Sequence, residues 1–233
     1  PLGPIRGEEL LAGSQQLSTR SGIVVSFTAG LVSLLVADEE AVTLFESTLR
    51  LHDELELPES EVLHLFLAKA LALDGTVAAY ERALPEFMAA IEINPEYARP
   101  YIGVAGWHYL KGADQLDTES LLDAVDLYAQ AMAAPTRPPA PIIEAKAHLG
   151  QGNAYLVLAQ FDDIDFAQTA KREYQAVAEL ESACRGGLAW WDPRAWGPWK
   201  SHFESHPDYC PQLSKIVDIA EESRLFLDDF EAG

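Results

Sequence analysis

Three segments of the chain repeat one pattern: a small residue, an aromatic residue four positions later and another small or aliphatic residue three positions after that. A looser fourth copy precedes them. This feature constrains the fold most, because small residues let two helices approach closely and the aromatic ring fills the space between adjacent helix pairs. Repeated helix hairpins are therefore expected. The copies are Ala41, Phe45 and Thr48; Ala83, Phe87 and Ala90; Ala124, Tyr128 and Ala131; and Ala170, Tyr174 and Val177.

Apolar residues at helical spacing, separated by turn signals, predict eight helices in four pairs. Each copy of the pattern lies in the second helix of a pair. Pro85 is expected to shorten or kink the start of its helix, and Lys111-Gly112 is interpreted as a turn. The predicted ranges are Gly22–Val36, Glu39–Glu54, Ser60–Leu73, Ala79–Ile93, Ala98–Lys111, Glu119–Ala133, Pro141–Leu158 and Phe166–Ala183.

Two strings in these helices resemble the tetratricopeptide repeat family. Residues 94–101 read Asn-Pro-Glu-Tyr-Ala-Arg-Pro-Tyr, similar to the family's junction between repeats, and residues 152–155 read Gly-Asn-Ala-Tyr, similar to its first-helix core. The resemblance covers about residues 22–182 and implies an all-α, right-handed superhelix of about four hairpins. Extra residues inside the third and fourth pairs break the family's period, so a related helical-hairpin repeat is an alternative.

The chain is expected to have three parts: an N-terminal extension over residues 1–21, interpreted in part as a cloning remnant, the repeats over 22–183, and a non-repeat cap over 184–233. The cap holds a segment with four tryptophans, interpreted as a cover for the last repeat, with a ligand platform as the alternative. Its second half predicts one amphipathic helix. That helix spans Gln212 to Phe230, with Leu213, Ile216, Val217, Ala220, Leu225 and Leu227 on or near one side.

The net charge of −21, from 16 basic and 37 acidic residues, limits the kinds of partner. Phosphate-rich surfaces are bound through Lys and Arg, so nucleic acid and anionic membranes are not expected as partners. A protein or peptide with a basic surface is favoured. The uncharged run Ser21–Ala37 is short for a membrane span and predicts a buried helix, with a signal-anchor remnant as the alternative. A cytoplasmic protein of unknown oligomeric state is expected.

The sequence offers little for catalysis. It contains no P-loop string and no Gly-x-Ser-x-Gly elbow, so no enzyme, cofactor or metal site is expected. His202, His206 and Cys210 are spaced four apart, but Pro207 interrupts the helix that would align them. A metal-dependent enzyme that uses this segment is a remote alternative. Cys184 and Cys210 are either disulfide-bonded or buried thiols.

The family resemblance implies that a partner segment binds along the first helices of the pairs. Arg99, Lys146 and Asn153 also resemble part of a carboxylate-gripping set, although Gly103 and Gly150 stand where that set would have Asn or Arg. The expected function is a protein–protein interaction module: a scaffold, an adaptor or a regulatory subunit. A peptide or ligand sensor that regulates an attached effector is the alternative. The predicted groove residues are Phe27, Leu31, His64, Leu67, Arg99, Ile102, Tyr109, Lys146, Leu149 and Asn153.

Overall fold

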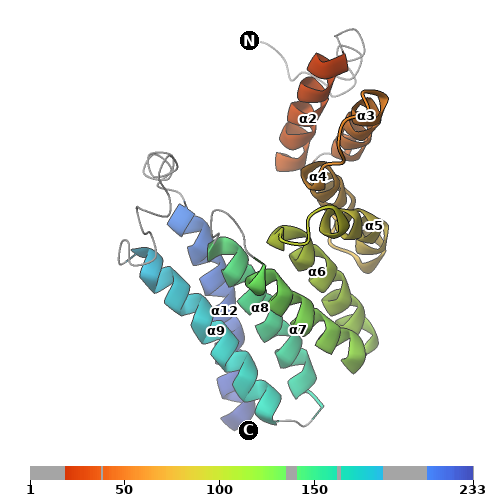
Figure 1. Cartoon of the computed structure of the whole chain (residues 1–233). Coiled ribbons are helices and arrows are strands. Elements are labelled where there is room, and N and C mark those ends of the chain that lie inside the picture. The colour runs from red at the N-terminus through yellow and green to blue at the C-terminus, as the bar shows by residue number, and fades with distance from the viewer. Residues whose placement is uncertain (1–18, 38, 135–140, 162–163, 186–208, 233) are drawn as a thin grey trace. The chain divides into compact units, whose positions relative to one another are not determined.

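The structure is a computed structural model that describes residues 19–37, 39–134, 141–161, 164–185 and 209–232. Within these ranges all regular elements are α-helices and no strand occurs, so the predicted all-α class is confirmed. None of these helices is both long and apolar enough to cross a membrane. The helices are α2 (Thr19–Leu35), α3 (Glu40–Glu54), α4 (Glu61–Leu71), α5 (Val77–Ile93), α6 (Ala98–Gln115), α7 (Thr118–Ala133), α8 (Pro141–Ala159), α9 (Ile164–Arg185) and α12 (Tyr209–Ala232) (Figure 1).

Two predicted helix boundaries are wrong, for identifiable reasons. Pro85 lies inside α5 and does not shorten it; the helix begins earlier, where the Thr76 hydroxyl caps it by accepting a hydrogen bond from the Ala79 N–H at 3.2 Å. Gly112 does not end α6. A Cβ at Gly112 would lie 2.7 Å from Leu121 Cγ, so the glycine permits close packing. The chain turns instead at Leu116, which has a φ of 53°.

The chain divides into two compact units, Pro1–Gly103 and Val104–Gly233, and the division falls inside α6. In the first unit, α2 packs against α3, α3 against α4 and α4 against α5. A cluster of three phenylalanine rings holds the first three of these helices together. The ring centroids of Phe27, Phe45 and Phe66 lie 5.7 to 5.9 Å apart in each pairing.

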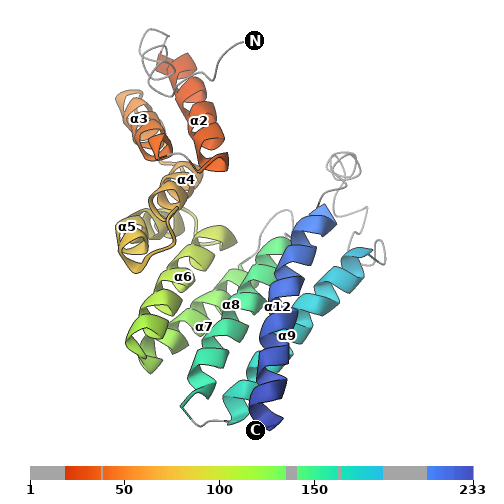
Figure 2. The same cartoon turned by 180° about the vertical axis from the view of Figure 1, so that it is seen from behind.

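The second unit has α8 at its centre. This helix packs against α7, α9 and α12, and α12 also packs against α9, so that α8, α9 and α12 lie side by side (Figures 1 and 2). Buried residues of α12 join those of α9 in one core cluster, which includes Tyr174, Val177, Val217 and Leu227. The predicted amphipathic helix is therefore present. Leu225 differs from the prediction, because it is exposed.

The repeated sequence pattern marks the core. All twelve residues of the four copies are buried. The aromatic ring of each copy lies against a glycine of a first helix: Phe45 on Gly30, Phe87 on Gly103, Tyr128 on Gly150 and Tyr174 on Gly152. An added Cβ would come within 2.2 to 2.8 Å of ring atoms at these four positions. The glycines therefore make room for the rings.

Candidate functional site

One face of α8 carries residues that the sequence assigned to the groove. Lys146 is exposed, and Leu149, Asn153 and Leu156 are half-buried. They are spaced three or four residues apart, so they form one stripe along the helix. Leu149 and Leu156 pack against the core of α9 and α12, which holds them in place while part of each remains accessible. The stripe offers a partner apolar contact beside a cationic side chain.

Asn153 is oriented by the core beneath the stripe. The buried Tyr174 hydroxyl donates a hydrogen bond to Asn153 Oδ1 at 2.9 Å. Since the amide oxygen is directed toward Tyr174, the two N–H donors of the same amide are directed away from it. Asn153 is thus suited to donate hydrogen bonds to the main-chain carbonyl of a bound segment. A tyrosine of the repeat pattern therefore positions a residue of the stripe.

Burial strongly raises the pKa of Tyr174 above its ordinary value of 10.0, against a smaller opposing effect of the Ser223 hydroxyl. The folded protein therefore keeps this proton at a pH where the unfolded chain releases it. Stability is unaffected below about pH 10 and falls above it, by about 1.4 kcal/mol per pH unit for this group. We expect Tyr174→Phe to remove this contribution to the loss of stability at alkaline pH. The free energies of unfolding of both proteins in urea at pH 8, 10 and 11 measure it. Equal slopes for both proteins above pH 10 would contradict the assignment.

The predicted groove residues of α6 follow the same spacing as those of α8. Arg99 is exposed, and Ile102 and Tyr109 are half-buried. Tyr109 packs against a buried cluster that includes Leu121 and Leu158, and its burial raises the pKa of its hydroxyl. α6 therefore presents a cation near its start and apolar surface further along, as α8 does.

The corresponding apolar residues of α2 and α4 pack against the core of the first unit to different degrees. Leu67 is buried in a cluster with Phe45, while Phe27 and Leu31 pack against that cluster. Leu67 is not accessible to a partner, which corrects its assignment to the groove. Phe27, Leu31 and His64 are half-buried, like Ile102 on α6 and Leu149 on α8, so the correction concerns Leu67 alone.

His64 has a structural partner that sequence reasoning missed. Its Nδ1 lies 2.7 Å from Glu86 Oε2, and His148 Nδ1 lies 2.7 Å from Glu173 Oε2. A carboxylate oxygen only accepts, so each imidazole donates its N–H. Each bond joins the first helix of a pair to the second. A sequence signal existed in part, since both glutamates directly precede the aromatic residue of the repeat pattern, Phe87 and Tyr174.

A carboxylate-gripping set is incomplete here for a packing reason. Gly103 and Gly150 occupy the positions where such a set would have Asn or Arg. Added Cβ atoms there would come within 2.4 Å of Phe87 and 2.2 Å of Tyr128, respectively. No larger side chain fits while these rings keep their places. Positions 103 and 150 therefore supply no side-chain group beside Arg99 or Lys146 for contact with a partner.

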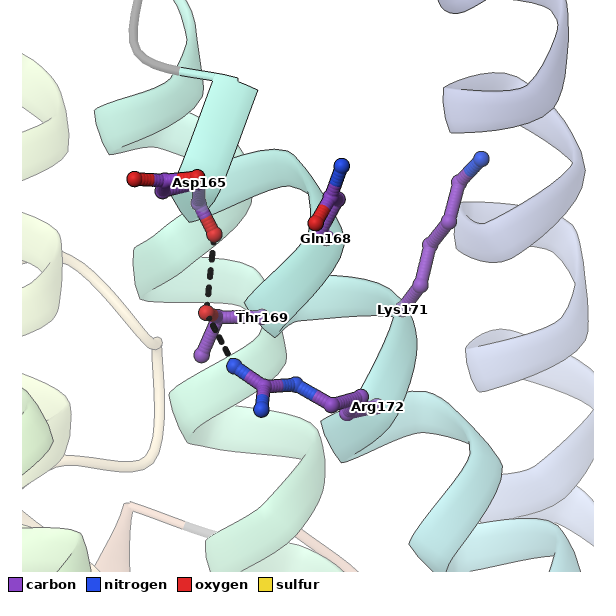
Figure 3. A pocket seen from close by; sticks show the side chains of 5 residues that line it. All are labelled: Asp165, Gln168, Thr169, Lys171 and Arg172. Carbon is purple, nitrogen blue, oxygen red and sulfur yellow. Dashed lines mark hydrogen bonds between the residues drawn. The ribbon is translucent and has the colours of Figure 1, made fainter.

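A shallow depression lies at the start of α9. It is lined by Asp165, Gln168, Thr169, Lys171 and Arg172, all of one helix (Figure 3). Arg172 donates to Thr169 Oγ1 at 2.8 Å, and that hydroxyl donates to the Asp165 carbonyl at 2.8 Å. These two bonds lie within α9 and join three of the five lining residues. The depression gives no argument for catalysis.

Metal-ligating residues do not cluster within the described ranges, where no group of three or more His, Cys, Asp or Glu could hold an ion. The predicted tryptophan segment, the pair His202 and His206, and the side chains of Cys184 and Cys210 lie outside the part of the chain that the structure describes. In comparisons with known proteins, no family model, no curated protein and no solved structure matches the chain.

Proposed function

We propose that the chain is a tetratricopeptide-like repeat protein that binds a segment of another protein along its first helices. The observation that supports this most is the stripe of α8, where the core holds Leu149 and Asn153 in place beside the exposed Lys146. Such a surface buries apolar side chains of an extended or helical segment and fixes its main chain by hydrogen bonds. The protein then acts as a scaffold, an adaptor or a regulatory subunit.

The charge of the neighbouring surface favours a basic segment. Exposed carboxylates occupy the outer face of α7, with Glu119, Asp123 and Asp126, and Asp218 and Glu221 are exposed on α12. Like charges on an approaching segment would be repelled, while Lys and Arg would be attracted. We therefore expect a bound segment that is rich in Lys or Arg.

Selection from a displayed peptide library on the full chain tests the proposal. We expect enriched peptides to carry apolar anchors and excess Lys or Arg. Their association rate should fall as ionic strength rises, because screening shortens the range of charge attraction to about 10 Å at 0.1 M. A photo-crosslinking residue in place of Arg99 or Lys146 should label the bound peptide.

Matched control positions exist on the second helices. Met88 of α5 and Leu122 of α7 are exposed, so the same crosslinking residue fits there. We expect these positions to label the peptide weakly or not at all. Equal labelling from control and stripe positions would contradict binding along the first helices. Failure to enrich any peptide would contradict the binding function itself.

A further inference from the structure

The contacts of α4 and α8 align these two helices residue by residue. His64 of α4 lies 2.7 Å from Glu86, and His148 of α8 lies 2.7 Å from Glu173. Each glutamate belongs to the second helix of the pair and directly precedes the aromatic residue of the repeat pattern. Position 64 of α4 is therefore equivalent to position 148 of α8.

The aromatic rings of the preceding hairpins give the same alignment independently. The Tyr128 ring lies against Gly150, two residues after the paired histidine of α8. The Phe45 ring stacks on Phe66, two residues after the paired histidine of α4, with ring centroids 5.9 Å apart. Phe66 thus occupies in α4 the position that Gly150 occupies in α8.

Burial follows the same alignment. Leu67 is 4% exposed, and its equivalent Gln151 is 7% exposed. The small residues that follow them are buried as well. Leu67 is therefore the counterpart of a buried residue of α8 and not of its partner-binding stripe. The residue of α4 that is equivalent to Asn153 of the stripe is Lys69.

Lys69 resembles Asn153 in its surroundings as well as in its position. Both side chains are half-buried. The Lys69 ammonium lies over the Phe66 ring, 5.2 Å from its centroid, and Asn153 accepts the hydrogen bond of the Tyr174 hydroxyl at 2.9 Å. An aromatic residue therefore restrains each polar group. An ammonium has three N–H donors and a side-chain amide has two, so both groups can donate to a bound segment.

We propose, on the basis of the function proposed above, that Lys69 of α4 donates a hydrogen bond to a main-chain carbonyl of the bound segment. The exposed carboxylates of the protein disfavour acidic side chains in that segment. A main-chain carbonyl is the acceptor that a basic segment always offers, and hydrogen bonds to the main chain are a general means of holding extended peptides. Lys69 is thus a further partner-binding residue.

The test uses the full chain and a labelled peptide that the library selection enriches and that crosslinks to position 146. Fluorescence anisotropy measures its dissociation constant. We expect Lys69→Met to raise this constant about threefold to tenfold, as the loss of one hydrogen bond does. Lys69→Arg keeps a cation with N–H donors, so its dissociation constant should stay within about twofold of that of the wild type.

Lys111→Met is the matched control. The Lys111 ammonium lies 5.4 Å from the centroid of the Trp107 ring, so this change removes the same charge and the same kind of ring contact. Lys111 follows Tyr109 by two residues and therefore leaves α6 in nearly the opposite direction, at about 100° per residue. We expect the dissociation constant of Lys111→Met to stay close to that of the wild type.

Replacing each side chain of the peptide by alanine in turn shows which peptide group Lys69 contacts. A main-chain contact predicts that Lys69→Met weakens the binding of every alanine variant by a similar factor. If that factor disappears with one replaced side chain, Lys69 binds that side chain, and the main-chain contact is overturned.

Three other outcomes would also overturn the role of Lys69. One is equal affinity in Lys69→Met and Lys111→Met, in which case crosslinking at position 146 still supports the proposed function. Another is a loss in Lys69→Arg as large as that in Lys69→Met, because the arginine keeps donors and charge. If no peptide binds the wild type, the proposed function fails together with the role of Lys69.

Discussion

Replacing Leu227 by alanine should destabilise the protein by about 2 to 5 kcal/mol, the cost of removing a buried leucine side chain from a core. Leu227 is 1% exposed and belongs to the cluster that α12 forms with α9. The cavity would lie between α12 and the helices beneath it. Its cost should appear in urea unfolding at neutral pH as a lower midpoint with an unchanged slope.

Leu225→Ala is the matched control for this experiment. It removes the same atoms two residues earlier on the same helix, but Leu225 is 55% exposed. Residues two apart on a helix point in nearly opposite directions, at about 100° per residue. We expect a change within about 0.5 kcal/mol. Equal losses at the two positions, or no loss at Leu227, would show that α12 does not stabilise the second unit through this face.

The sequence predicted the helices to within a few residues, and two of their starts carry a local cap. Thr76 caps α5 and Asp117 caps α7, each by accepting a hydrogen bond from a backbone N–H of the first turn. Gly112 was misinterpreted for a different reason. A glycine near a helix end signals termination, but here it makes room for Leu121, a residue of the next helix. Tertiary packing overrode a local signal here, and the local sequence does not show which residue of another helix will pack on the glycine.

The candidate surface was predictable only in part. Register fixes the direction in which a residue leaves its helix, which is why Lys146, Leu149 and Asn153 form one stripe. Register does not say which neighbour covers that direction. On α4 the predicted row meets the Phe45 cluster, so Leu67 is buried. The uncharged run of α2 predicted a buried helix, which is only partly right: Leu31 and Leu34 pack against the core, whereas Val32 is exposed.

Gly150→Ala should destabilise the protein, although alanine is the better helix former by about 1 kcal/mol. An added Cβ would lie 2.2 Å from Tyr128 Cζ, and this ring is buried, so it cannot swing into solvent. Overpacking of this kind costs about 1 to 3 kcal/mol and should exceed the gain in propensity. Thermal or urea unfolding measures the balance.

A double-mutant cycle separates the clash from the propensity. In the background of Tyr128→Leu the ring is gone, so we expect Gly150→Ala to become neutral or stabilising by up to about 1 kcal/mol. Ala129 is exposed on α7, so Ala129→Gly measures the difference in helix propensity alone. Its effect on the free energy of unfolding has the opposite sign, because it replaces alanine by glycine. If Gly150→Ala destabilises the protein equally with and without the Tyr128 ring, then Gly150 does not make room for that ring. Some group other than the Tyr128 ring would then exclude a side chain from position 150 of α8.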